Sequence, residues 1–232
     1  MATVYAVGVG PGDPELLTRK AERVLRSVDV VLAPVSNPSE ASVALGTIRE
    51  FIDENRQEIV VHQFPMTSDQ SRLIPAWQEA ASLIAAHAEA GRSVAFITIG
   101  DPLFYSTFIY LLHILREQWP QLPIEIIPGI SSISAAAAVA ALPLVEADEK
   151  MVVIPATAGI EQIKAALSSY ETVVLLKVKP LFSAIIDLLR STGREQKTVF
   201  VERVGSSRQK VLTDFSEIVA HTPDYLSLMI IK

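Results

Sequence analysis

The stretch VYAVGVGPGDP occupies residues 4 to 14, and it decides how the chain begins to fold. Residues 4–9 form a short continuous run of apolar residues that favour β-structure, as is typical of a strand buried on both faces of a parallel sheet. A turn rich in glycine and proline follows at once, and from Leu16 to Val28 apolar residues recur at helical spacing. The sequence therefore predicts a strand, a loop and a helix, which together form the first unit of an α/β fold.

The same alternation continues through the first 144 residues. Apolar runs rich in β-branched residues predict further strands at 29–33, 59–62, 93–99 and 124–127. Helical periodicity predicts helices at 41–53, 70–90, 103–118 and 131–142. We expect Gly91 to cap the longest of these helices at its C-terminal end. This order predicts a mostly parallel sheet with helices on its faces.

The polar and acidic stretch 143–150 is the expected domain boundary. It gives an N-terminal α/β domain of residues 1–144 and a C-terminal α/β domain of residues 145–232. In the second domain we expect strands at 151–154, 173–178, 197–201, 210–213 and 226–231. Helices are expected near 160–167 and 181–189, with a short one between the last two strands. This ending predicts a mixed sheet, and no internal repeat relates the two halves.

Composition excludes several classes of protein. The chain has 232 residues, 50% of them hydrophobic, with a net charge of −6 and no cysteine. The acidic balance argues against a nucleic-acid-binding protein, which needs clustered Lys and Arg. Without cysteine there is no disulfide, thiolate nucleophile or cysteine-bound metal. The scattered histidines are expected to be structural or exposed, so we predict no metal site; they are His62, His87, His113 and His221.

No apolar stretch approaches the roughly 20 residues that a membrane-spanning helix needs. No positively charged leader precedes the first apolar run, which breaks at Gly8. We therefore expect a cytoplasmic protein without membrane partners.

Three loops lie where an expected strand leads into a helix, the position at which parallel sheets bind ligands. The first is Gly8-Val9-Gly10-Pro11-Gly12-Asp13-Pro14. It is similar to a dinucleotide-binding loop, but the third glycine of that pattern would fall at Asp13, so the match fails. A tight turn without a ligand explains these glycines about as well as a binding loop does.

The other two loops also have simpler explanations when each is taken alone. In Gly100-Asp101-Pro102, Asp101 is a favoured helix N-cap and proline is favoured at the first helical position. In Pro128-Gly129-Ile130-Ser131-Ser132, either serine is a suitable cap. This loop also lacks the closing glycine of a hydrolase nucleophile elbow.

Taken together, in this order and at these separations, the three loops resemble the signatures of the tetrapyrrole (corrin/porphyrin) methylase family. The first signature continues through Leu16-Leu17-Thr18, and the similarity extends to residues 172–178 and 201–209. The resemblance therefore covers essentially the whole chain, which a single Gly-Asp-Pro tripeptide would not do.

The resemblance implies two α/β domains with a cleft between them, S-adenosylmethionine as methyl donor, S-adenosylhomocysteine as product, and usually a homodimer. Carried over position by position, the cofactor contacts fall on Pro11, Ile99, Gly100, Asp101, Phe104, Ser131, Ser132, Lys177 and Gly205. Contacts with the tetrapyrrole substrate fall on Gly12, Asp13, Tyr105 and Ser106. Lys177 departs from the apolar residue that some family members have there.

Within the family, the sequence Tyr105-Ser106-Thr107-Phe108 is similar to members that methylate carbon 20 of precorrin-2 or cobalt-precorrin-2, also called cobalt-factor II. The resemblance thus implies this reaction in cobalamin biosynthesis. The alternatives are a sibling methylase that acts at another ring carbon or on uroporphyrinogen III, a nucleotide-binding oxidoreductase, and a ligand-binding protein without catalysis.

Methyl transfer from a sulfonium to carbon is an in-line displacement, so the main task of the protein is to hold the reactants in line. No nucleophilic residue is required. Asp13, Tyr105 and Glu202 are candidates for a general base only by their motif positions, and we assign none of them. The substrate carries carboxylates, with which basic residues pair well. Arg203, Arg208 and Lys210 are candidates for that role, or form an ordinary solvated surface.

Overall fold

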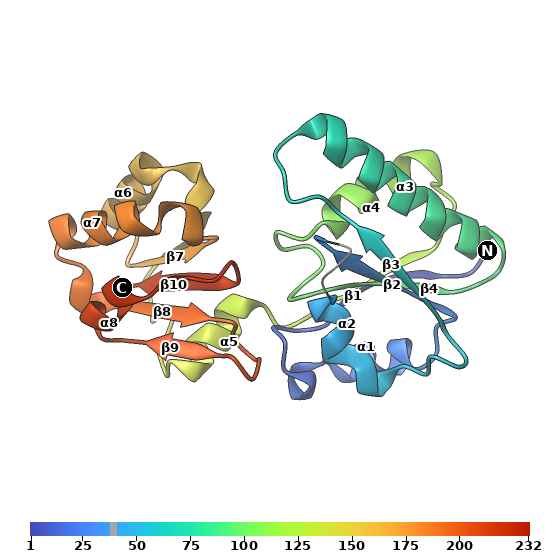
Figure 1. Ribbon diagram of the computed structural model, residues 1–232, viewed down its shortest axis with the longest axis horizontal. Coiled ribbons are helices and arrows are strands. Elements are labelled where there is room, and N and C mark those ends of the chain that lie inside the picture. Colours follow the sequence, from blue (N-terminus) through green and yellow to red (C-terminus); the bar gives the residue numbers. More distant parts are fainter. Residues whose placement is uncertain (38–40) are drawn as a thin grey trace. The chain divides into compact units, whose positions relative to one another are not determined.

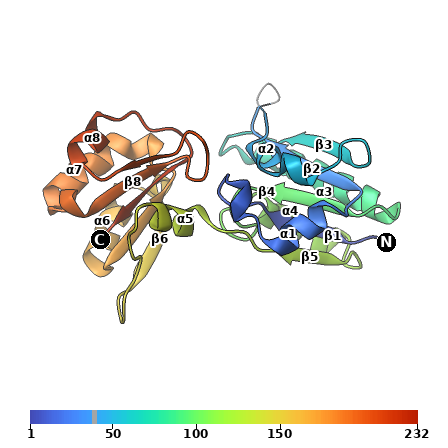
Figure 2. The same cartoon turned by 90° about the horizontal axis from the view of Figure 1, so that it is seen from below.

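Five parallel strands form the sheet of the N-terminal part of the computed structural model, which describes residues 1–37 and 41–232. Its order is β3-β2-β4-β1-β5, which places β1 between β4 and β5 (Figure 1 and Figure 2). The strands are β1 (Val4–Gly8), β2 (Val30–Val35), β3 (Glu58–Gln63), β4 (Val94–Thr98) and β5 (Ile124–Ile127). Because all the pairs are parallel, the carboxyl ends of the neighbours β4, β1 and β5 lie along the same sheet edge.

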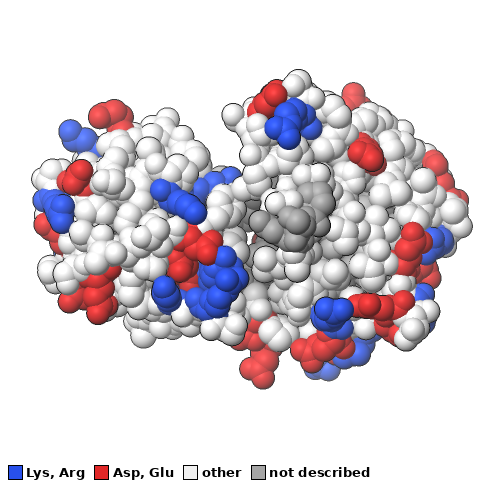
Figure 3. Space-filling model, in the orientation of Figure 1, with Lys and Arg blue, Asp and Glu red and all other residues white. Residues whose placement is uncertain are grey.

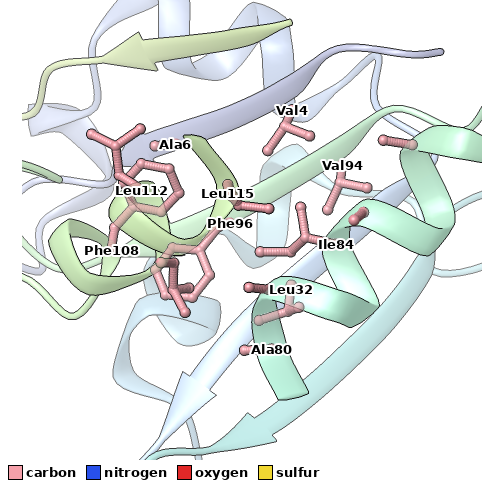
Figure 4. Packing of buried hydrophobic residues seen from close by; sticks show 14 of the residues in the cluster. Val4, Ala6, Leu32, Ala80, Ile84, Val94, Phe96, Phe108, Leu112 and Leu115 are labelled. Carbon is pink, nitrogen blue, oxygen red and sulfur yellow. The ribbon is translucent and has the colours of Figure 1, made fainter. Parts of the chain in front are cut away.

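Helices cover both faces of this sheet (Figure 1). They are α1 (Arg19–Leu25), α2 (Val43–Ile48), α3 (Gln70–Glu89) and α4 (Phe108–Gln118). Alternate residues of each central strand face opposite helix pairs. Val4 and Phe96 pack with Ile84 of α3 and Leu115 of α4 (Figure 4), whereas Val7 packs with residues of α1 and α2. This two-sided burial explains why the strands are continuous apolar runs.

The C-terminal part forms a mixed sheet in the order β6-β7-β10-β8-β9. β6 and β7 are parallel, and the other pairs are antiparallel, as the sequence predicts. The strands are β6 (Met151–Pro155), β7 (Thr172–Leu176), β8 (Thr198–Glu202), β9 (Lys210–Leu212) and β10 (Ser227–Ile231). The helices are α5 (Ser132–Val139), α6 (Ile160–Ser169), α7 (Phe182–Thr192) and α8 (Phe215–Ala220). α6 and α7 supply much of this unit's core, around Phe200.

The two units divide earlier in the chain than residue 144. They are Met1–Ser131 and Ser132–Lys232, so α5 belongs with the second unit. The carbonyl of Leu144, just after α5, accepts a hydrogen bond of 2.5 Å from the Thr172 hydroxyl at the start of β7. The polar stretch 143–150 marks a loop correctly, but tertiary contacts, which a local pattern does not contain, decide which sheet the preceding helix joins.

The helix expected at 103–118 begins only at Phe108. Tyr105 has a left-handed φ of 52°, which a continuous α-helix does not allow. Residues 103–107 therefore form a turn between β4 and α4. The capping role predicted for Gly91 is confirmed, because α3 ends at Glu89 and Gly91 has a φ of 82°. In the part of the chain that the structure describes, no helix combines the length and the apolarity that crossing a bilayer requires.

Candidate functional site

Three glycines bring the three loops together at the carboxyl edge of the first sheet. Gly8 ends β1, Gly100 follows β4, and Gly129 follows β5. A Cβ atom on Gly129 would lie 2.1 Å from the carbonyl oxygen of Gly100. A Cβ atom on Gly8 would lie 2.6 Å from that same oxygen and from the nitrogen of Gly129. At Gly8 and Gly129 the backbones thus meet at a distance that only glycine permits.

Backbone hydrogen bonds join the first two loops. The N–H of Gly100 donates to the carbonyl of Gly10 at 2.7 Å, and these two residues form an isolated antiparallel bridge. The N–H of Val9 donates to the carbonyl of Thr98 at 2.9 Å. Gly10 and Gly100 both have left-handed φ angles, 74° and 73°, which glycine adopts without strain. The loops after β1 and β4 are therefore one connected structure.

Asp101 ties the second loop to the third. One carboxylate oxygen accepts from the N–H of Leu103 at 2.8 Å, and the other accepts from the N–H of Gly129 at 3.1 Å. The first bond is the local turn that a capping aspartate makes, but α4 begins seven residues later, so Asp101 does not cap it. The second bond spans two loops, which the capping interpretation does not predict.

An exposed apolar segment follows Asp101. Leu103, Phe104 and Tyr105 are 50%, 41% and 48% exposed, and the Phe104 and Tyr105 rings pack edge to face at 5.0 Å. Exposure leaves both rings free to cover a flat ligand. The left-handed backbone of Tyr105 is unfavourable for a bulky residue, and such strain is found preferentially at functional sites.

Ser106 lies at the base of this segment with its hydroxyl turned to the interior. Its side chain is buried, its Oγ lies 3.1 Å from the hydroxyl oxygen of Thr98, and it accepts from the N–H of Phe108 at 3.2 Å. The structure thus assigns Ser106 to the support of the loop. The contact of Ser106 with a substrate, which the family resemblance implies, stays a prediction.

The other residues of the first unit that are predicted to contact a ligand differ in burial and in their hydrogen bonds. Pro11 is buried, and Gly12 has a positive φ of 136°. Asp13 accepts from the N–H of Glu15 at 2.9 Å and so caps the short 3-10 helix at Pro14–Leu16. Ile99 directly follows β4 and is partly buried.

Ser131 and Ser132 follow the Gly129 corner. Both are partly buried, and Ser132 begins α5 in the second unit.

Lys177 and Gly205 belong to the second unit. Lys177 directly follows β7, is exposed, and has a left-handed φ of 55°. Gly205 follows β8 with a φ of 80°, and its N–H donates to the side chain of Gln209 at 2.8 Å. β7 and β8 both pair with β10, so the two residues lie at one edge of the second sheet.

Two candidates from the sequence, Glu202 and Arg203, take part in a partly buried network of hydrogen bonds. Glu202 is 5% exposed and accepts from His221 at 3.0 Å and from the N–H of Asp224 at 2.6 Å. Arg203 donates through its Nε to Asp224 at 2.7 Å. Glu202 and Arg203 thus hold the turn after β8, which leaves Arg208 and Lys210 as the exposed cations there.

This network should contribute to stability in a pH-dependent way. Burial by itself raises the pKa of Asp224, but the hydrogen bond and charge of Arg203, with nearby backbone N–H groups, lower that pKa below its usual value. A lowered pKa contributes stability above the ordinary carboxylate range and loses it as the pH falls through the folded-state pKa. We expect Asp224→Asn to lower the free energy of unfolding at pH 7 by about 1 kcal/mol. Below about pH 4 the difference should shrink.

Urea unfolding of the wild type and the variant between pH 3.5 and 7 measures this difference. Asp187→Asn is the matched control, because Asp187 pairs with Arg190 on the surface at 3.6 Å with 72% of its side chain exposed. We expect almost no effect there. A pH-independent deficit in Asp224→Asn would contradict the assignment.

Sequence reasoning missed three contributors to the site. Gly8 and Gly129 were seen only as parts of motifs, and Thr98 was not considered. A glycine at the end of a buried apolar strand is the available signal for Gly8, since a buried strand otherwise favours β-branched residues. Nothing local marks Thr98. Among the described residues, no cluster of His, Asp and Glu is suited to hold a metal ion.

The space-filling view shows Lys and Arg interspersed with Asp and Glu on the face that is drawn (Figure 3). No continuous basic surface of the kind that binds nucleic acid is seen on that face. A parallel sheet whose strand-end loops converge is instead typical of α/β proteins that bind small ligands outside the carboxyl ends of their strands.

The family model for tetrapyrrole (corrin/porphyrin) methylases matches residues 3–219. The chain belongs to this family. It is 38% identical, over 99% of its own length and 95% of the relative's, to a probable cobalt-precorrin-2 C(20)-methyltransferase of Methanocaldococcus jannaschii. It is 37% identical, over 82% of its length and 78% of the relative's, to the cobalt-precorrin-2 C(20)-methyltransferase of Salmonella typhimurium.

Solved structures agree on the fold. A cobalt precorrin-4 methyltransferase matches with a TM-score of 0.76 at 20% identity, covering 99% of this chain and 94% of that one. Uroporphyrin-III C-methyltransferase of Thermus thermophilus, complexed with S-adenosylhomocysteine, matches with a TM-score of 0.68 at 24% identity, covering 99% and 92%. The fold class expected from the sequence is confirmed.

Proposed function

We propose that this protein transfers the methyl group of S-adenosylmethionine to carbon 20 of precorrin-2 or cobalt-precorrin-2, a step of cobalamin biosynthesis. The observation that carries the proposal is the similarity, over most of the chain, to relatives named for this reaction. The convergence of the three loops at one sheet edge supports it independently. The names of these relatives favour methylation at carbon 20 over the sibling reactions and over an oxidoreductase.

The residues at the junction fit the donor. A Cβ atom on Gly100 would meet nothing within 4 Å, so there is space on that side of the residue, whereas Gly8 and Gly129 are closed by their neighbours. The partly buried carboxylate of Asp101 suits an ammonium group, and the exposed Phe104 ring suits an adenine. The proposed donor contacts are Pro11, Ile99, Gly100, Asp101, Phe104, Ser131, Ser132, Lys177 and Gly205.

The donor supplies an activated methyl group, so the protein need only position the reactants and exclude water. The loop junction provides rigid positioning, since its backbones are in contact and tied by Asp101. The proposed substrate contacts are Gly12, Asp13, Tyr105 and Ser106. Arg208 and Lys210 are proposed to pair with its carboxylates, because Arg203 is held by Asp224.

Incubation with precorrin-2, and separately with cobalt-precorrin-2, in the presence of S-adenosylmethionine carrying a ¹³C methyl group tests the reaction. We expect NMR to find the label on carbon 20 of at least one product. A label at another carbon would overturn the assignment within the family. Calorimetry should show binding of S-adenosylhomocysteine but not of NAD, since the glycine pattern for NAD fails at Asp13.

The proposal includes a cytoplasmic location and a homodimer, as the sequence leads us to expect. Sedimentation equilibrium tests the dimer, and cell fractionation tests the location.

A further inference from the structure

We infer that Thr98 and Ser106 are positioning residues, which fix the exposed loop of residues 103–105 against the sheet so that Tyr105 meets the tetrapyrrole. This inference rests on the proposed function and deepens it. Neither hydroxyl needs to touch the substrate. Thr98 ends β4, and Ser106 lies two residues before α4, so the pair closes the loop at its base.

The two hydroxyl groups are buried and lie within hydrogen-bonding distance of each other. Thr98 is 9% exposed and Ser106 is 7% exposed, and their hydroxyl oxygens lie 3.1 Å apart. The N–H of Phe108 donates to the Ser106 oxygen, and the Thr98 hydroxyl lies 3.5 Å from the carbonyl oxygen of Ile99. One arrangement uses every proton: Phe108 donates to Ser106, Ser106 to Thr98, and Thr98 to Ile99. Such chains stabilise their members mutually.

The loop needs this support because it is strained and exposed. Leu103, Phe104 and Tyr105 each expose about half of their surface to solvent, so burial of their apolar side chains contributes little to the stability of the loop. Tyr105 is also left-handed, which costs about 1 kcal/mol or more for a non-glycine residue. The hydrogen bonds of Thr98 and Ser106 at its C-terminal end, and of Asp101 at its N-terminal end, hold the loop of residues 103–105 in a conformation that it would not favour by itself.

Thr98 also connects the loop to the glycine junction. It pairs with Gly8 in the register between β4 and β1, and its carbonyl accepts from the N–H of Val9 at 2.9 Å. A change in its side chain should therefore reach the loop through Ser106, while the backbone bonds that hold the donor-binding junction stay intact. This predicts an effect on the tetrapyrrole that is larger than the effect on the donor.

Thr98→Val tests the inference, since it keeps the shape and removes the hydroxyl. We expect the KM for the tetrapyrrole to rise about fivefold. The affinity for S-adenosylhomocysteine should fall only about twofold, because Phe104 is the only proposed donor contact within the loop. Thr98→Ser keeps the hydroxyl and should restore wild-type KM. Thr47→Val is the matched control: Thr47 is 6% exposed, lies in the same unit, and donates to the carbonyl of Val43 in α2.

Chymotrypsin gives a readout that needs no turnover. The exposed Leu103, Phe104 and Tyr105 are good cleavage sites once the loop opens, so Thr98→Val should be cut there about fivefold faster than the wild type or Thr47→Val. Mass spectrometry identifies the cut. Equal cleavage of the two valine variants, or loss of donor and tetrapyrrole affinity in parallel, would overturn the inference. If the wild type methylates no tetrapyrrole, the proposed function fails, and cleavage alone decides the positioning role.

Discussion

Gly129→Ala is expected to lower the free energy of unfolding by about 3 kcal/mol and to abolish measurable binding of S-adenosylhomocysteine. The added Cβ would lie 2.1 Å from the carbonyl oxygen of Gly100 and 2.8 Å from the carbonyl carbon of Gly8. Both neighbours are backbone atoms, one at the end of β1 and one in the loop after β4, so no rotation of a flexible side chain relieves the clash. The loops must separate, and the junction that we propose for the donor is lost with them.

Gly46→Ala is the matched control for this substitution. Gly46 lies within α2, and a Cβ atom there would meet nothing within 4 Å. Since alanine is favoured over glycine in a helix, we expect a gain of about 0.5–1 kcal/mol and unchanged binding. Chemical unfolding and calorimetry on both variants measure the contrast. A Gly129→Ala protein as stable as the wild type would show that the three loops are not in contact.

Asp101→Ala is expected to weaken the binding of S-adenosylhomocysteine by tenfold or more and to lower the free energy of unfolding by about 2 kcal/mol. The loss in the free energy of unfolding comes from two lost hydrogen bonds, to the N–H groups of Leu103 and Gly129, at about 1 kcal/mol each. The affinity for S-adenosylhomocysteine should fall because the carboxylate both fixes the third loop and is proposed to hold the ammonium group of the donor.

Asp69→Ala separates this role from simple capping. Asp69 caps α3 by accepting from the backbone N–H and the hydroxyl of Ser71, so its loss should cost about 1 kcal/mol and leave binding intact. Thermal unfolding and calorimetry on the two alanine variants distinguish the roles. If Asp101→Ala binds S-adenosylhomocysteine as tightly as the wild type does, then Asp101 is a structural residue only.

Local motifs in the sequence identify some of these residues but not the contacts that they make with distant parts of the chain. The Gly-Asp-Pro motif led to Asp101 as a candidate, but its bond to Gly129 joins residues 28 positions apart and has no local signal. The same holds for Thr98 and Ser106: the motif marks the serine as a candidate substrate contact, and only the structure shows its buried hydroxyl beside that of Thr98. Arg203 was proposed for substrate carboxylates, and Asp224, distant in sequence, holds it instead.

Helix ends and the domain boundary show the same limit. The pattern from Leu103 onward is apolar enough for a helix, yet the left-handed Tyr105 delays α4 to Phe108. The acidic loop at 143–150 was identified correctly, but α5 before it joins the second unit. Periodicity reports which face of an element is apolar, and it does not report which neighbour covers that face.

Local sequence patterns predict the alternation of strands and helices, the mixed second sheet, and the three loops that resemble the family. They do so because the spacing of apolar residues and the residues favoured in turns depend on only a few neighbouring positions. Only the tertiary structure decided that Gly8, Gly100 and Gly129 touch, that Asp101 joins two of their loops, and which hydroxyls and cations are already engaged. Those facts depend on strands that are distant in the chain becoming neighbours in the sheet, and the order of strands in a sheet is set by packing of the whole unit.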